Sequence, residues 1–411
     1  MCQEQKQQSY FNLSIGIAAV AGLCCGFLGS GMFKPLATII SDIFLNLLKL
    51  VSLPIIFLSI VSTASSMESL DEVKLIGRRV IRYTFLTTII AATIALALFV
   101  VVDPARVSYV EGTEATHMSF QDYSNHLLSI IPSNFIEPFQ NNNVIGVLFL
   151  AILLSFAILS IQKEKRQTLN TFFSSIYTAI MKITTWIIGI IPIAIWAFVV
   201  LFVDDLRNGL QISSLALYLM CVMTANLLQG FVVLPILLKW KGISPLETSR
   251  GMFPALSVAF FSKSSSAALP TAMKCGENNL GISSKVARFS FPLCTTINMN
   301  GCAGFILITV LFVSMSNGMA FSPIELITWI GIATIAAVGN AGVPMGCYFM
   351  ASAFLAAMNV PLNIMGAILP FYALIDMLET AINVWSDSCV SAIVDKEVTE
   401  LEAAVLQPVS Q

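Results

Sequence analysis

The stretch PLETSRGMFPALSVAFFSKSSSAALPTAMKC, residues 245–275, decides how this chain folds. It has an apolar half, then the charged and hydroxyl-rich SKSSS, then a shorter apolar half. A helix needs about 20 apolar residues to cross a bilayer, and neither half is that long. Irregular backbone at membrane depth is tolerated only where it is buried in protein or lines a cavity. The stretch therefore predicts a re-entrant hairpin of two short helices with a serine tip.

The composition of the whole chain places this hairpin in a membrane. The 411 residues are 57% hydrophobic and 11% charged, with a mean hydropathy of +0.85. A soluble protein of this length cannot bury so much apolar surface. Six earlier runs approach or exceed the length of a membrane span: Phe11–Met32, Ala37–Thr63, Tyr83–Val102, Val144–Ile161, Ile183–Val203 and Ser214–Leu238. We expect an all-α polytopic membrane protein whose first run is a retained helix, not a cleaved signal peptide.

Charge and cysteine usage exclude other classes of protein. The net charge of −2 gives no reason to expect a nucleic-acid partner. The nine cysteines are odd in number and lie mostly inside apolar segments, which argues against a disulfide framework. His117 and His126 both lie in a hydrophilic loop, so we expect solvated side chains there and no metal site.

The positions of the cations predict the orientation in the membrane. Lysine and arginine collect in cytoplasmic loops. Alternate loops carry few cations, and the long loop after the third run is acidic. The cation-rich positions lie before the first run and after the second, fourth and sixth: Lys6; Lys74, Arg78, Arg79 and Arg82; Lys163, Lys165 and Arg166; Lys239 and Lys241. Both termini are therefore predicted to be cytoplasmic.

A second interrupted segment follows the first hairpin. It consists of Leu326–Val338, the tip GNAGVPMG and Cys347–Val360. A span with polar interruptions follows each hairpin: Val286–Val313, which contains TTINMNG, and Leu362–Val394. A hairpin followed by a polar helix, twice, is typical of two inverted repeats that meet at a binding site near the bilayer midplane.

The last span carries the stretch IDMLETAINVWSD, residues 375–387. In a helix, Asp376, Thr380, Asn383 and Asp387 fall within roughly 40° of one another, and Glu379 lies about 60° to one side. Polar groups in hydrocarbon are costly unless paired, so these side chains are functional candidates. Hard cations take oxygen ligands. The stripe predicts a track of oxygen atoms suited to Na⁺ and to an ammonium group.

Each polar element also has a structural interpretation. The serines at 264–266 could serve helix packing or capping, TTINMNG could be a kink, and Asp387 could belong to a buried pair. Their combination favours a transport site over these. A channel needs a continuous wide pore, whereas these groups suit occlusion. An aspartyl protease would need adjacent carboxylates, but Asp376 and Asp387 lie about 16 Å apart along one helix. We therefore expect no enzyme.

These motifs together resemble the dicarboxylate/amino acid:cation symporter family, which includes the glutamate transporters. The resemblance covers nearly the whole chain and rests on LLKLVSLPIIFLSIVSTASSMESL in the second span, KSSSAALP, TINMNG, AGVP and D-x₃-T-x₂-N-x₃-D. It implies eight transmembrane helices, two re-entrant hairpins, a homotrimer and an elevator mechanism. It also implies that residues 1–240 form six spans, mostly a trimerisation scaffold, with spans three and six in the transport domain. Residues 241–400 would form the transport core and 401–411 a cytoplasmic tail.

The resemblance also implies a role for each site residue. The substrate would contact the first tip (Ser264, Ser265 and Ser266), Val343 of the second tip, and Cys302. Asp376 and Thr380 would hold its amino group and Asn383 its carboxylate. One sodium would bind between Asp387 and the carbonyls of Asn383, Cys294 and Asn298. A second would bind under the second hairpin, at carbonyls from Thr296 and from Ala337, Val338 and Asn340. A third sodium site would involve Thr87, Thr88 and Asn298, next to Asn300.

Three departures from the family pattern alter the expected substrate and coupling. Acidic-substrate members have an arginine where this chain has Glu379, and Cys302 replaces a hydroxyl that helps to bind the substrate's side-chain carboxylate. Like charges about 4 Å apart at an effective dielectric of 20 cost roughly 4 kcal/mol, which disfavours dicarboxylates. Asn300 replaces an aspartate, so we expect a weakened third site and one or two coupled sodium ions. Lys263 could neutralise Glu379 or Asp376.

The sequence thus predicts an inner-membrane symporter that couples inward sodium movement to uptake of a small neutral amino acid. Serine or threonine is the leading substrate, because the ETA-x-N arrangement is similar to the sodium/serine-threonine branch, and alanine follows. The alternatives are a sodium- or proton-coupled symporter for acidic amino acids or C4-dicarboxylates, or one for basic amino acids. In the proton-coupled alternative Glu379 would carry the proton, since burial favours the neutral carboxyl group.

Overall fold

The computed structural model describes residues 2–65, 76–105, 131–140, 144–207, 212–340 and 345–406, and within these ranges the regular structure is helical throughout. His117, His126, Val343 and the tail from 407 onward lie outside the described residues. The elements are α1 (Cys2–Ser65), α3 (Arg78–Val102), α5 (Glu137–Gln140), α6 (Val144–Ser160), α7 (Lys163–Gly189), α8 (Ile191–Arg207), α9 (Ile212–Leu228), the π-helical η2 (Gln229–Val233), α10 (Leu234–Trp240), α11 (Pro245–Ser262), α12 (Ser265–Leu280), α13 (Ser284–Ile297), α14 (Asn300–Ser316), α15 (Pro323–Gly339), α16 (Gly346–Ala357) and α17 (Asn363–Leu406).

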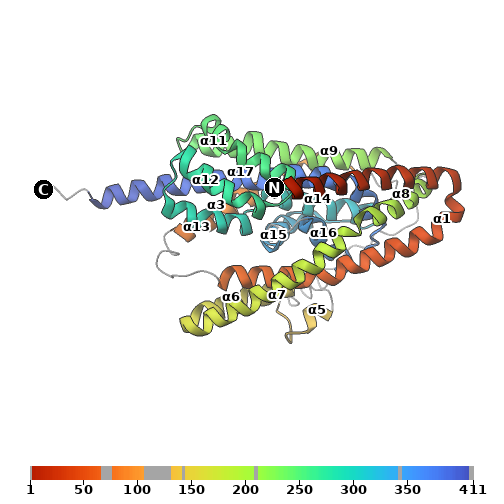
Figure 1. The fold of residues 1–411 in the computed structure, drawn as a ribbon, viewed down its shortest axis with the longest axis horizontal. Coiled ribbons are helices and arrows are strands. Elements are labelled where there is room, and N and C mark those ends of the chain that lie inside the picture. The colour runs from red at the N-terminus through yellow and green to blue at the C-terminus, as the bar shows by residue number, and fades with distance from the viewer. Residues whose placement is uncertain are drawn as a thin grey trace.

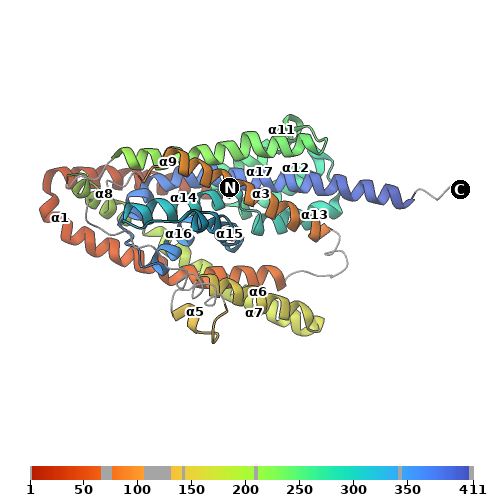
Figure 2. The same cartoon turned by 180° about the vertical axis from the view of Figure 1, so that it is seen from behind.

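The helices form one bundle with a group of outlying helices beside it (Figure 1). Helix α1 runs to one end of the molecule, turns, and returns along the far side, where it packs on α6, α7 and α8. The sequence predicted two separate spans here, whereas α1 is helical throughout and bends, with Pro35 and Pro54 inside it. Seen from behind, α3, α9, α11, α12 and α17 lie together on the opposite side of the molecule from α6 and α7 (Figure 2).

The segment of the first predicted hairpin forms two helices, α11 and α12, that pack against each other. Ser244 caps the start of α11 by accepting from the Glu247 N–H, and the helix ends at Lys263, whose φ of 54° is left-handed. The next residue, Ser264, already caps α12 by accepting from the Ala267 N–H at 3.2 Å. At the base, the Asn279 side chain donates to the Gly251 carbonyl of the other arm at 2.7 Å. A connection of two residues therefore reverses the chain.

Helices α15 and α16, which lie where the second hairpin is predicted, both pack on α14. A capping box starts α15, in which the Ser322 and Glu325 side chains each bond the other's backbone N–H. Trp329 of α15 meets Phe354 of α16 edge to face, with ring centroids 5.5 Å apart. The four tip residues 341–344 lie outside the described part of the chain.

Helix α14 is the centre of the bundle. All its residues from Asn300 to Ser314 are buried. One apolar cluster surrounds it and takes in the start of α17 up to Ile375. A second cluster, formed with α11, α12 and α13, takes in α17 from Val384 onward. The part of α17 between Ile375 and Val384 lies where the two clusters meet. It carries four of the predicted substrate residues: Asp376, Glu379, Thr380 and Asn383.

The length and composition of the helices identify a multi-pass membrane protein. Among the described residues, five helical stretches are long and apolar enough to cross a bilayer. They are Arg78–Val102, Lys163–Gly189, Ser213–Trp240, Ser284–Ser316 and Asn363–Leu401. Shorter apolar helices include Ile191–Asp204, Pro323–Gly339 and Gly346–Ala357.

A charged cluster ties α17 to the bundle near its carboxyl end. The Glu397 carboxylate accepts from Lys241 Nζ at 2.7 Å and lies 3.3 Å from Arg79 Nε. The Tyr83 hydroxyl also donates to Glu397. The pKa of the Lys241 ammonium is raised above its usual value, mainly by its hydrogen bond to Glu397 and to a lesser extent by its hydrogen bond to Tyr83. This cluster fixes α3 and the end of α10 against α17.

Candidate functional site: a buried polar layer around an unwound turn

The site is built around a break in the helix formed by α13 and α14. Asn298 (φ −99°, ψ 71°) and Met299 (φ −108°, ψ 65°) leave helical geometry between two helical halves. This is the interruption that the motif TTINMNG predicted. Backbone carbonyls and amides released from a helix can serve as ligands where a transporter binds its ions.

The Asn298 side chain is the hub of the polar layer. Its Nδ2 donates to Asp387 Oδ1 at 3.0 Å and to Ser386 Oγ at 2.9 Å. Its Oδ1 accepts from Asn300 Nδ2 at 2.8 Å and from the Thr87 hydroxyl at 3.3 Å. All five residues are buried. The structure therefore brings together Asp387, Asn298, Asn300 and Thr87, which the sequence placed on three separate spans.

Two of the predicted sodium ligands turn toward their own helix. The Thr296 hydroxyl donates to the Pro292 carbonyl at 2.9 Å, and the Thr88 hydroxyl donates to the Thr84 carbonyl at 2.7 Å. The Cys294 carbonyl accepts from the Asn298 N–H at 2.7 Å. These contacts place the residues next to the polar layer, with their backbone geometry fixed by the break.

Sequence reasoning missed three contributors to this layer: Thr295, Ser386 and Gln229. The Thr295 hydroxyl donates to Asp387 Oδ2 at 3.4 Å. Gln229 Nε2 donates to Asn300 Oδ1 at 2.6 Å and to the Thr87 carbonyl at 3.2 Å. One feature of the sequence could have indicated Gln229: it and Asn226 are two amide side chains within the largely apolar sixth run.

The α17 residues lie beside the start of α14. Asn383 Oδ1 accepts from the Gly301 N–H at 2.9 Å, which fixes the side chain against the break. A Cβ at Gly301 would lie 2.7 Å from Asn226 Oδ1 and 3.0 Å from Glu379 Cα. Only glycine allows this close approach of α14 to α17. Thr380 is buried about one turn before Asn383 on the same helix, and Asp376 is buried about two turns before it.

Glu379 differs from Asp387, whose carboxylate accepts from Asn298 and Thr295. Its side chain is 1% exposed, and neither oxygen has a hydrogen-bond partner in the described part of the chain. Lys263 at the first tip exerts a favourable charge interaction on Asp376. Among the described residues, Lys263 forms no ion pair within 4.0 Å with either acid. A buried carboxylate without a donor has strong unused capacity to accept a hydrogen bond.

The serines of the first tip divide into different environments. Ser264 caps α12, Ser265 is buried, and Ser266 is exposed on the surface of α12. The second hairpin reaches the site through Asn340, whose Nδ2 donates to the Cys302 sulfur at 3.0 Å. Ala337 lies one turn earlier and its carbonyl accepts from the Asn340 N–H at 3.1 Å. Val338 is half-buried between them.

The cysteines require one correction. The sequence argued against a disulfide framework, and the structure nevertheless joins Cys302 of α14 to Cys347 of α16 by a disulfide. The other cysteines of the described residues, including Cys294, are unpaired. The pair joins two helices that pack on each other, and it is the one disulfide among the described residues.

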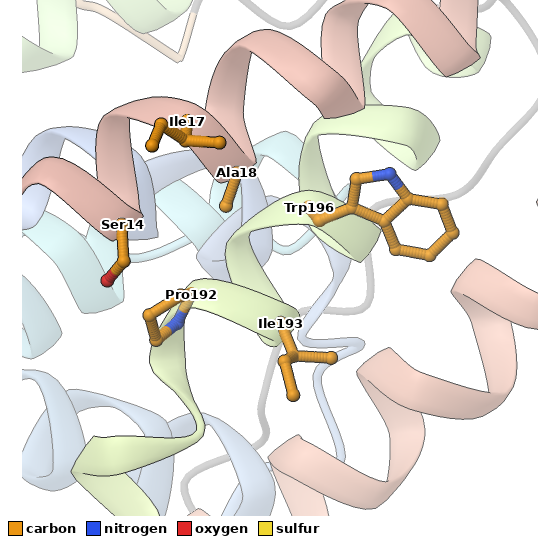
Figure 3. Close-up of a pocket in the computed structure, with 6 residues that line it drawn as sticks. All are labelled: Ser14, Ile17, Ala18, Pro192, Ile193 and Trp196. Carbon is orange, nitrogen blue, oxygen red and sulfur yellow. The ribbon is translucent and has the colours of Figure 1, made fainter. Parts of the chain in front are cut away.

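A large cavity of about 310 Å³ lies away from this polar layer (Figure 3). It sits between α1 and α8 and is lined by Ser14, Ile17, Ala18, Pro192, Ile193 and Trp196. Its apolar walls offer no set of oxygen ligands. None of the predicted site residues lines this cavity.

Comparison with known proteins gives a consistent result. The model of the sodium:dicarboxylate symporter family matches residues 11–397. Neutral amino acid transporter B(0) of Oryctolagus cuniculus is 26% identical over 441 aligned positions, which cover 95% of this chain and 81% of the relative. Neutral amino acid transporter A of Homo sapiens is 24% identical, with 91% of this chain and 79% of the relative covered. A Caenorhabditis elegans protein named as a sodium-dependent excitatory amino acid transporter is 26% identical, with coverage of 86% and 81%.

Proposed function

Because the chain belongs to the sodium:dicarboxylate symporter family, whose members are transporters and not enzymes, we propose that it couples inward sodium movement to uptake of a small neutral amino acid. Serine or threonine is the first candidate and alanine the next. The relatives named as neutral amino acid transporters support this class of substrate.

The buried and unpartnered Glu379 is the observation that carries the proposal. A substrate hydroxyl can donate to its carboxylate, directly or through a water, and satisfy a group that is otherwise costly to bury. A substrate carboxylate at the same place would be repelled by Glu379 and by Asp376 one turn away. Asp376 with Thr380 would hold the amino group, and Asn383 the α-carboxylate.

Sodium is the coupling ion in this proposal. Asp387 with the carbonyls of Asn383, Cys294 and Asn298 would form one site. The Thr296 carbonyl with carbonyls from the end of α15 would form a second. Asn300 Nδ2 donates to both Asn298 and Ser386. A neutral amide that is already hydrogen-bonded therefore occupies the position where a carboxylate would support a third sodium ion. We therefore propose one or two coupled ions.

The transport mechanism in this proposal is an elevator within a homotrimer. Residues 241–400 with α3, α9 and α10 would form the moving domain, and the remaining spans of 1–240 the scaffold. The packing of α3 and α9 against α14, and the position of α6 and α7 to one side, support this division. Both termini would face the cytoplasm from the inner membrane.

Ligand binding to the purified protein tests the substrate class. We expect serine, threonine and alanine to raise the unfolding temperature in sodium buffer and to have no effect in potassium buffer, because a ligand stabilises the state that binds it. Stabilisation by aspartate instead would favour the acidic alternative. Stabilisation by lysine or arginine alone would identify Glu379 as the partner of a cationic side chain.

A further inference from the structure

Three potential metal ligands from three helices converge beside the polar layer. They are Cys302 of α14, Cys347 of α16 and Glu379 of α17. The two sulfur atoms and one carboxylate oxygen all lie within 4.8 Å of one another, and all three residues are buried. The two cysteine Cα atoms are 5.4 Å apart. None of the three has a sodium ligand's role in the proposed transport cycle.

Reduction of the disulfide would leave two thiols beside the Glu379 carboxylate. In the part of the chain that the structure describes, neither Glu379 oxygen has a hydrogen-bond partner, although the side chain is buried. Asn340 Nδ2 faces both sulfurs, at 3.0 Å from Cys302 and 3.3 Å from Cys347. The Asn340 Oδ1 atom has no hydrogen-bond partner among the described residues, and the two ends of an amide can exchange places. Asn340 can thus turn an oxygen toward the same centre.

We propose that Cys302, Cys347 and Glu379 form a binding site for a thiophilic divalent cation of the Zn²⁺ class in the chain whose two cysteines are reduced. Zinc is bound by thiolates at about 2.3 Å and by carboxylates at about 2.0–2.2 Å. In a tetrahedral site such ligand atoms lie roughly 3.5–3.8 Å apart. The three groups need only small side-chain rotations to reach that spacing. Soft sulfur ligands select against Na⁺, so this site differs from the sodium sites.

The disulfide and the metal site are alternative states of the same pair. Reduction breaks the S–S bond, and two electrons and two protons convert it to two thiols. Metal binding then replaces the two thiol protons, which are released to solvent. The site therefore exists only in the reduced chain. In either state, a bond or a cation joins α16 to α14.

The position of the site predicts an effect on transport that rests on the proposed function. Glu379 and Cys302 line the proposed place of the substrate side chain, and Asn383 donates to the Cys302 sulfur at 3.4 Å. A cation held there occupies the acceptor that a substrate hydroxyl would use. Zinc is therefore expected to inhibit uptake in competition with the substrate.

Direct metal binding tests the site without any measurement of transport. The full-length protein is reduced with a water-soluble phosphine, which takes an oxygen atom from water as the disulfide becomes two thiols, and the phosphine is removed. Zn²⁺ is then titrated against a chromophoric chelator in sodium-free buffer. Cd²⁺ is titrated in parallel, and the ultraviolet charge-transfer band of thiolate–Cd²⁺ bonds is recorded.

We expect about one Zn²⁺ per reduced chain and none in the oxidised chain. Cys347→Ser and Cys302→Ser should each weaken Zn²⁺ binding at least about tenfold and roughly halve the Cd²⁺ band. Glu379→Gln should weaken binding while the Cd²⁺ band is retained. Cys275→Ser is the matched control, because Cys275 is a buried cysteine of α12 outside the site, and it should bind as the wild type does.

Two results would overturn the proposal. One is a reduced wild-type chain, with its thiols confirmed by titration, that binds no Zn²⁺. The other is unchanged affinity in both Cys302→Ser and Cys347→Ser, which lie on different helices. Because the readout is binding, a wrong transport substrate would leave these results as they are.

Discussion

Replacement of Glu379 by glutamine isolates the charge that the substrate proposal depends on. Glutamine has nearly the same size as glutamate and keeps one carbonyl oxygen as an acceptor. The Glu379 side chain is 1% exposed and its oxygens have no donor among the described residues. The substitution therefore removes a negative charge from a closed site without breaking an existing hydrogen bond.

The expected change in selectivity follows from Coulomb's law. Two like charges at an effective dielectric of 20 repel by about 4 kcal/mol at 4 Å and about 2 kcal/mol at 8 Å. Each 1.4 kcal/mol is tenfold in affinity, so the affinity for aspartate relative to serine should rise by roughly 30- to 700-fold in Glu379→Gln. Serine itself should change only a fewfold, because the carbonyl oxygen still accepts from a hydroxyl.

The assay is competition by aspartate and by alanine against labelled serine in proteoliposomes with an inward sodium gradient. Alanine carries no polar side chain and serves as the internal reference for folding and insertion. Glu247→Gln, at an exposed carboxylate in the first turn of α11, is the control variant. An aspartate-to-serine ratio that stays within about threefold of the wild type would refute the assignment of Glu379 to selectivity.

Three further predictions concern the ions and the packing. Asp387→Asn should raise the sodium concentration for half-maximal uptake at least about tenfold and abolish the sodium-dependent rise in unfolding temperature, because a buried ligand charge is lost. Asp395→Asn on the same helix is the control. An equal loss of sodium response in both variants would contradict the assignment of Asp387 as a sodium ligand. Gly301→Ala should lower the free energy of unfolding by about 1–3 kcal/mol and reduce uptake, because the added Cβ would contact the backbone of α17. Gly331→Ala is the control: its Cβ would have no atom within 4 Å, so neither the free energy of unfolding nor uptake should change. An inward proton gradient without sodium should drive no serine uptake above the level without a gradient, and uptake under that gradient would transfer the coupling role to Glu379.

Local signals were strong enough to predict the broken helices. SKSSS and TTINMNG both place polar residues inside apolar segments, and a helix ends within each of them in the structure. By contrast, two separate spans were predicted for the first two runs, and in the structure a single bent helix, α1, contains both. Proline inside a helix can kink it without ending it, so the sequence alone does not separate the two outcomes.

Partners that lie far apart in sequence could not be predicted. Gln229 bonds Asn300, and Ser386 bonds Asn298, only because three helices adopt particular rotations about their axes. A single sequence gives the periodicity of each helix but not which faces meet. The same limit hid the proximity of Cys302 and Cys347, which are 45 residues apart on separate helices.

Sodium-driven uptake of labelled serine into proteoliposomes that hold the purified protein is the most direct measurement of the central claim. Unlabelled threonine, alanine, aspartate and lysine are the competitors. We predict uptake only under an inward sodium gradient, with competition by threonine and alanine and none by aspartate or lysine. Uptake that does not depend on the sodium gradient, or competition by aspartate as strong as that by threonine, would contradict the proposal of sodium-coupled uptake of a neutral amino acid.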